Sequence, residues 1–238
     1  MHGFARALGL ELTLQRRSFM YPATVVSTAL ICALVLLLPS QPVPPRLAAF
    51  FVFMDPAIIG LSFVGASVLL EKAQGTLAAL GVTPLRPAAY VGAKAVSLTL
   101  VTFGSGLVVA YVATRGAVDL ARQLVALSLC SAVAVLIGLV SVARTASMNQ
   151  LVVILLWVST VLYLPLLSHF GTLPRGAEAI LAVIPSYAML VVLTAAVDPA
   201  SVSAAAQVAS TLYLGVWVWG GWRWTLREFE KVIVTEGR

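Results

Sequence analysis

The chain has 238 residues, of which 61% are hydrophobic and only 10% are charged, and its mean hydropathy is +1.01. Soluble domains are about one-quarter charged, so this composition excludes an ordinary soluble enzyme or binding protein. The apolar runs are long and unbroken rather than alternating, which favours membrane-spanning helices over a barrel. We therefore predict an all-α polytopic membrane protein with the lipid bilayer as its surroundings. The net charge of +6 is interpreted as a topology signal, and no nucleic-acid partner is expected.

Residues 1–22 are predicted to form a helix that lies in the headgroup region before the chain enters the membrane. Arg6, Arg16 and Arg17 fall on one half of that helix and bulky apolar residues on the other, as in interfacial helices. The apolar half consists of Phe4, Leu8, Leu12 and Phe19. A signal peptide is the alternative, but the basic segment is long for one and LLLPSQPVPP offers no small-x-small cleavage site.

Six apolar segments are predicted to span the membrane. They are residues 23–38, 47–70, 87–112, 123–143, 151–167 and 204–222. A further apolar segment, residues 179–197, contains Pro185, Ser186 and Tyr187 in its middle. If it does not cross, eleven Lys and Arg residues share the side of both termini and four lie on the other side; if it crosses, the counts are seven and eight.

The positive-inside rule therefore favours six spans with both termini in the cytoplasm. Residues 179–197 are then interpreted as a broken or re-entrant segment that dips from the outer face, with a neighbouring chain or a wet cavity near Pro185. Residues 223–238 are interpreted as a cytoplasmic tail.

Residues 71–86, between the second and third spans, are too polar to lie in lipid. Thr76 can cap a short helix in which Leu77 and Leu80 share one face, and Thr83–Pro84 can open the next long helix. From this pattern alone the stretch is either a structured connection or a docking helix for a cytoplasmic partner.

The motifs of common enzymes are missing from the sequence. No Gly-Lys dipeptide occurs, so the GxxxxGK[ST] phosphate-binding loop is absent, and the two histidines, His2 and His169, form no HExxH motif. Cys32 and Cys130 both fall inside apolar runs, which favours small core residues over a disulfide or a metal site. We expect no catalytic residues and no metal or cofactor bound by this chain.

Asp55 is the one carboxylate within a predicted span, about 12 Å along the helix from its outer end. A charge at this depth is costly and should face the bundle interior. Asp55 could contact a cationic substrate or carry a proton, or it could satisfy backbone groups freed by Pro56. Lys94, near the start of the third span, is expected to extend to the cytoplasmic boundary.

The stretch DPAIIGLSFVGASVLLEKAQGTLAALGVTPLRPAAYVGAK, Asp55 to Lys94, together with this layout, resembles the permease subunits of ABC-2-type (type V) ABC exporters. Among these it looks like the small bacterial permeases of the fluoroquinolone-export group. The layout agrees over nearly the whole chain and the specific motif over Asp55–Lys94 alone. A large extracellular domain, as in macrolide exporters, is absent.

The resemblance implies that the loop between spans two and three is a coupling helix that docks on a separate ATP-binding subunit. The matching positions are Glu71, Gly75, Thr76, Leu77, Leu80, Thr83, Pro84 and Leu85. It also implies two permease chains, identical or related, in the bacterial cytoplasmic membrane, with ATP and Mg bound by the partner. Residues 179–197 would be the short outer helices before the last span.

Two alternatives remain from the sequence. One is a haem-export permease of the cytochrome-maturation type, for which His169 is the available outer histidine. The other is a membrane assembly factor or enzyme that has no ATPase partner.

Overall fold

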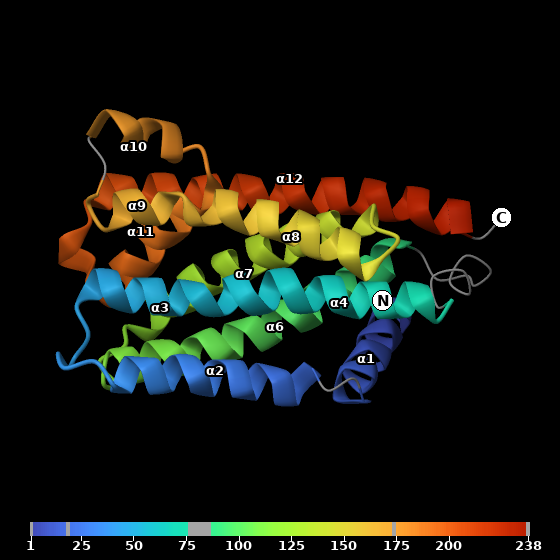
Figure 1. The fold of residues 1–238 in the computed structure, drawn as a ribbon, viewed down its shortest axis with the longest axis horizontal. Coiled ribbons are helices and arrows are strands. Elements are labelled where there is room, and N and C mark those ends of the chain that lie inside the picture. Colours follow the sequence, from blue (N-terminus) through green and yellow to red (C-terminus); the bar gives the residue numbers. More distant parts are fainter. Residues whose placement is uncertain (1, 18–19, 76–86, 173–174, 237–238) are drawn as a thin grey trace.

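The computed structural model describes residues 2–17, 20–75, 87–172 and 175–236, and all the regular secondary structure in these ranges is helical (Figure 1). The long helices run side by side along the molecule, and α1 lies at one end of the bundle. The elements are α1 (His2–Arg17), α2 (Met20–Leu36), α3 (Pro45–Ile58), the π-helix η1 (Ile59–Phe63), α4 (Val64–Ala73), α6 (Pro87–Ala113), α7 (Leu120–Ala143), α8 (Met148–Tyr163), α9 (Pro165–His169), α10 (Arg175–Leu181), α11 (Pro185–Val197), the 3-10 helix η2 (Pro199–Ser201) and α12 (Ala204–Glu236).

Four described helical segments are long and apolar enough to cross a membrane. They are Pro45–Ala73, Pro87–Ala113, Leu120–Ala143 and Met148–His169. A fifth is formed if Phe4–Arg17 and Met20–Leu36, bent by 67° at their junction, count as one broken span. The structure thus confirms an all-helical protein with four to five candidate spans. The sixth predicted span is part of α12, which is less apolar than the others because of its Gln207 and tryptophans.

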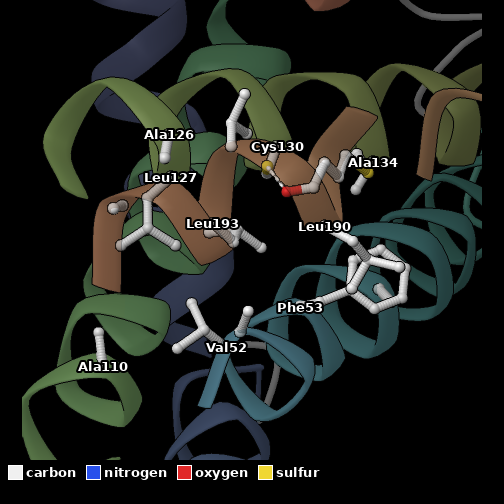
Figure 2. Packing of buried hydrophobic residues seen from close by; sticks show 14 of the residues in the cluster. Val52, Phe53, Ala110, Ala126, Leu127, Cys130, Ala134, Leu190 and Leu193 are labelled. Carbon is white, nitrogen blue, oxygen red and sulfur yellow. Dashed lines mark hydrogen bonds between the residues drawn. The ribbon is translucent and has the colours of Figure 1, made fainter. Parts of the chain in front are cut away.

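Helix α7 occupies the centre of the bundle. It packs against α12, α6, α11, α4 and η1. The largest buried cluster lies where α3, α7 and α11 meet, and Figure 2 shows Phe53, Leu127, Leu190 and Leu193 pointing into it. The Cys130 thiol lies there too, 3.9 Å from the Met189 carbonyl oxygen, as expected for a core cysteine.

The span Pro45–Ala73 contains an irregular centre that packs very closely on α7. Pro56 lies inside α3, and the chain then forms the π-helix η1, a type of insertion that often relieves a disrupted hydrogen-bond ladder. A Cβ atom on Gly138 of α7 would lie 2.5 Å from the Gly60 carbonyl oxygen, and one on Gly60 would lie 2.9 Å from the Ala134 Cβ. Glycine at both positions therefore permits backbone contact between these two spans.

The segment 179–197 is broken, at the place where the sequence has Pro185. Helix α10 ends at Leu181, and α11 begins at Pro185 after Ile184 takes an extended conformation. The 13 residues of α11 are too few to cross a bilayer, which takes about 20. Helix α11 is nevertheless buried along most of its length, between α12, α3 and α7.

The predicted tail is not separate from the last span. Helix α12 continues through Arg223 to Glu236 without interruption, because no proline or glycine follows Gly221 before its end. Its C-terminal end and α1 lie at the same end of the bundle, whereas α10 lies at the opposite end (Figure 1).

Helix α1 presents a mixed face to the bundle rather than an apolar one. Ala7, Glu11 and Gln15 are buried, while Leu10 and Leu14 are exposed. The buried face packs against α6, and the exposed side carries both leucines and the arginines Arg6, Arg16 and Arg17. The position of α1 in the headgroup region stays a prediction.

Candidate functional site

The candidate site is the base of the loop between α4 and α6. Glu71 and Gly75 belong to the described part, and Gly75 has φ +70°, a left-handed conformation that suits glycine where α4 ends. The remaining predicted docking positions lie outside the described residues: Thr76, Leu77, Leu80, Thr83, Pro84 and Leu85.

Lys94 of α6 lies at the centre of a buried ionic network beneath this loop. Its side chain is fully buried, in contrast to the expected exposed position at the membrane boundary. The Lys94 Nζ donates to Glu71 Oε1 of α4 at 2.6 Å, to Glu11 Oε1 of α1 at 2.9 Å and to Ser67 Oγ at 3.2 Å. The Lys94 ammonium group does not extend toward the membrane boundary, because its three acceptors lie inside the bundle.

Further hydrogen bonds complete the network. The Tyr90 hydroxyl donates to Glu71 Oε2, and the Lys94 ammonium lies 5.6 Å from the centre of the Tyr90 ring. The Gln15 amide donates to Glu11 Oε1 at 3.0 Å and to the Ser97 hydroxyl at 2.7 Å. Both carboxylates are thereby satisfied by several donors, which a buried charge requires.

The network joins the two helices that flank the loop to the N-terminal helix. Glu71 is two residues from the end of α4, and Lys94 is two turns into α6. Because a charge left unpaired in the interior is very unfavourable, α1, α4 and α6 are held together at this point. Glu71, which was expected to contact a partner, instead faces inward, so any surface for a partner must come from the residues that follow it.

A second set of polar contacts fixes α4 to α7 and α12. Lys72 Nζ donates to the carbonyl oxygens of Val142, Ala143 and Thr145 at 3.1, 2.8 and 3.0 Å. These carbonyl groups lie at the C-terminal end of α7 and in the turn after it, where a helix no longer supplies a backbone N–H donor to each carbonyl oxygen. Next to it, the Arg144 guanidinium makes two hydrogen bonds to the Glu228 carboxylate, at 2.8 and 2.7 Å.

The Arg144 contact, with Lys231 at 3.2 Å from the same carboxylate, lowers the pKa of Glu228 from its ordinary 4.5 to about 2. The donated hydrogen bonds stabilise the charged carboxylate. Glu228 therefore carries a full negative charge at neutral pH and connects α12 to the turn after α7.

Asp55 lies at mid-depth in the bundle and is fully buried. Its Oδ1 accepts a hydrogen bond from the Thr28 hydroxyl of α2 at 3.2 Å, and Ser105 of α6 lies beside the carboxyl group. Among the described residues, no hydrogen-bond partner reaches its Oδ2, and no group of three or more His, Cys, Asp and Glu could hold a metal ion. Asp55 thus faces the bundle interior, as predicted, and contacts α2 and α6.

Comparison with known proteins shows the family of the chain. The sequence matches the fluoroquinolones export permease protein family over residues 2–237. This chain belongs to that family. It is 30% identical, over 197 residues, to the fluoroquinolones export permease proteins of Mycobacterium tuberculosis strains CDC 1551 / Oshkosh and ATCC 25618 / H37Rv, covering 83% of this chain and 82% of each relative. No solved structure matches the chain.

In this export permease the break at Pro185 lies beside a mainly apolar cavity, and the expected neighbouring chain or wet cavity stays a prediction. Pro185 occupies the first turn of α11, and Ser186 is buried with no hydrogen-bond partner among the described residues, while Tyr187 is partly buried. A cavity of about 480 Å³ beside the break is lined mainly by apolar side chains, including Trp157 and Trp217. Residues of α7, α8 and α12 supply most of the lining beside the break.

The sequence interpretation of this permease missed Glu11, Gln15 and Tyr90. The prediction for α1 used its arginines, which are exposed, and did not consider Glu11. A signal was present, because Ala7, Glu11 and Gln15 recur every four residues and so share one helical face. That face is narrow and mostly polar, so a search for an apolar helical face does not find it.

Proposed function

We propose that this chain is the permease subunit of an ATP-driven exporter, and that residues 71–86 dock a separate ATP-binding subunit. The observation that carries the proposal is the buried Glu11–Lys94–Glu71 network. It binds both helices that lead into the loop to α1, so a displacement of the loop moves α4, α6 and α1 together. Family membership supports an export role, and the docking role comes from the resemblance to ABC-2-type exporters.

The proposed membrane arrangement has six spans: α2, α3–α4, α6, α7, α8–α9 and residues 204–222 of α12, with the rest of α12 in the cytoplasm. Both termini lie in the cytoplasm of a bacterial cell, α1 lies in the interface, and α10–α11 form the re-entrant outer segment. The location of α1 and the end of α12 at one end of the bundle, with α10 at the other (Figure 1), supports this orientation, as does the distribution of basic residues.

Two permease chains and two ATP-binding subunits would form the working transporter, with ATP and Mg²⁺ bound by the latter. ATP binding would bring the docked loops together, and transport follows because the two states hold the loops differently. Since the relatives are named as fluoroquinolones export permeases, we propose fluoroquinolones as the first cargo to test. The same family membership favours drug export over the haem-export and assembly-factor alternatives.

The experiment is expression of this permease together with its neighbouring genes, followed by co-purification of an ATP-binding protein with the permease. In the double variant Leu77→Asp/Leu80→Asp, we expect the ATP-binding protein to be lost while the permease remains inserted, because two carboxylates replace the predicted contact face. Normal co-purification in this variant would contradict the docking assignment.

The chain offers a matched control in Ile180→Asp/Val183→Asp. These residues have the same spacing and are 74% and 70% exposed. Ile180 lies in α10 and Val183 two residues after its end, and α10 is at the opposite end of the bundle from α1 (Figure 1). This control should retain the ATP-binding protein. If it loses the protein equally, the effect is general destabilisation and not loss of docking.

A further inference from the structure

A groove of about 830 Å³ lies at the same end of the bundle as the loop base. Its walls come from α4, from the turn between α7 and α8, and from α12. Three cationic side chains, Lys72, Arg144 and Lys231, and one anionic side chain, Glu228, line it. The groove therefore has a formal excess of two positive charges, and the proposed function uses none of them.

Two features that would repel an anion here are already paired. The Glu228 carboxylate is paired with Arg144 and Lys231, and the C-terminal end of α7 is paired with Lys72. The end of a helix carries a partial negative charge on its free carbonyl groups, and α7 ends in this groove. Lys72 donates to the carbonyl oxygens of Val142, Ala143 and Thr145. Its ammonium thus neutralises the C-terminal end of α7 and stays fixed in the wall.

The start of α8 adds a favourable element. Ser147, the N-cap of this 16-residue helix, and Met148, its first residue, both line the groove. The Ser147 hydroxyl accepts the Gln150 N–H at 3.4 Å, whereas the N–H groups of the first two helical positions have no acceptor within the helix, and the helix dipole is positive at this end. Together with the exposed face of Arg144, whose side chain is 64% exposed, this makes a site suited to a phosphate group.

The apolar part of the groove indicates what carries that phosphate. Leu69 and Leu70 at the end of one span and Met148 at the start of another line the same groove, and Leu70 and Met148 are 49% and 53% exposed. Both segments pass directly into the apolar surface of candidate spans. An acidic protein partner would match a groove with a polar rim, but this groove continues into an apolar surface. A lipid matches both parts, because it has a charged headgroup and apolar acyl chains.

We propose that this groove binds the headgroup of an anionic phospholipid, with the phosphodiester near Arg144, Lys231 and the start of α8, and the acyl chains against Leu70 and Met148. Basic pockets between helices at the cytoplasmic boundary bind anionic lipids by this chemistry. Bound there, the lipid contacts α4, α7, α8 and α12 at once, and its presence would stabilise the helix that leads into the loop.

The test uses the full permease alone in nanodiscs that contain phosphatidylglycerol and phosphatidylcholine in equal amounts. Native mass spectrometry counts the lipid that each chain retains. We expect the wild type to retain phosphatidylglycerol preferentially. Lys231→Gln should reduce that preference about five-fold and Lys231→Glu about 25-fold, on the general strength of one charge near an anionic headgroup. In both variants the Arg144–Glu228 pair remains.

The matched control is Arg227→Gln, which removes the same charge from an exposed position of the same helix outside the groove. It should leave the preference unchanged. Equal retention of the two lipids by the wild type would overturn the proposal, as would an equal loss in Arg227→Gln. If Lys231→Gln leaves lipid retention unchanged in nanodiscs, the lipid proposal is wrong. Loss of the ATP-binding protein from the same variant in the separate co-purification would then identify the groove as a protein-docking surface. Since the lipid assay contains no partner or cargo, its result is separate from that of the export proposal.

Discussion

Replacement of Lys94 by methionine tests whether the buried network fastens the base of the loop. Methionine has a similar length and no charge, so it fills the space of the lysine stem. Glu11 and Glu71, which are 2.9 and 2.6 Å from Nζ in the wild type, then remain as two buried carboxylates without a cation. We expect Lys94→Met to be strongly destabilised.

The magnitude follows from the contacts. Removal of one partner from a buried ion pair costs about 3–5 kcal/mol, because the other charge stays buried and unpaired. Each kcal/mol corresponds to about 2–4 °C in the Tm of a chain of 150–250 residues, so the expected loss is about 6–20 °C. The triple variant Lys94→Met/Glu11→Gln/Glu71→Gln contains no buried charge here, and it should recover most of that loss.

The assay is thermal unfolding of purified protein, with Lys231→Met as the control for loss of a lysine. Lys231 is largely exposed although it is also paired, so its replacement should change the Tm little. A Tm for Lys94→Met equal to that of the control would refute the reasoning. So would a triple variant less stable than the single one, because the loss would then not come from unpaired carboxylates.

Three other changes probe separate parts of the bundle. Gly138→Ala should destabilise the protein by about 1–3 kcal/mol, because the added Cβ would lie 2.5 Å from a backbone oxygen of η1. Gly104→Ala is the control: a Cβ there would meet no atom within 4 Å, so this variant should be neutral or stabilising. Chemical denaturation measures the free energy of unfolding of both variants. Asp55→Asn keeps an acceptor for the Thr28 hydroxyl and should insert and fold as the wild type, so reduced transport with normal yield would assign Asp55 a transport role. The folded-state pKa of Glu228 is depressed to about 2. The charged carboxylate therefore adds its full contribution to the free energy of unfolding above its ordinary pKa of 4.5, and this contribution is lost as the pH falls toward 2. Unfolding measured from pH 6 to pH 2 should show a steeper loss for the wild type than for Glu228→Gln.

Features that depend on local sequence were predictable. The long apolar runs place the spans within a few residues of their helices, because in lipid a helix must satisfy its own backbone. The interruption before Pro185 was predictable as well, since proline cannot continue a helix but fits its first turn. These signals need no knowledge of which segments are neighbours.

Features that depend on contacts between distant segments were not predictable. Lys94 looked like a residue at the membrane boundary because its partners are 83 and 23 positions away in the chain. The continuation of α12 past Arg223 was missed for a related reason: a change in charge marks a membrane boundary, but it does not end a helix. Such a helix ends only where its capping residues or its packing require it.

The backbone contact between Gly60 and Gly138 has a mechanical consequence. Gly60 lies about 22 Å along the helix from Pro45 and about 20 Å from Ala73, close to the midpoint of its span. Two backbones in contact at one such point can swivel there, but they cannot slide past one another without a clash. The contact therefore fixes the register of the span Pro45–Ala73 against α7 near its centre, and we expect any relative motion of the two helices to be a rotation about this point.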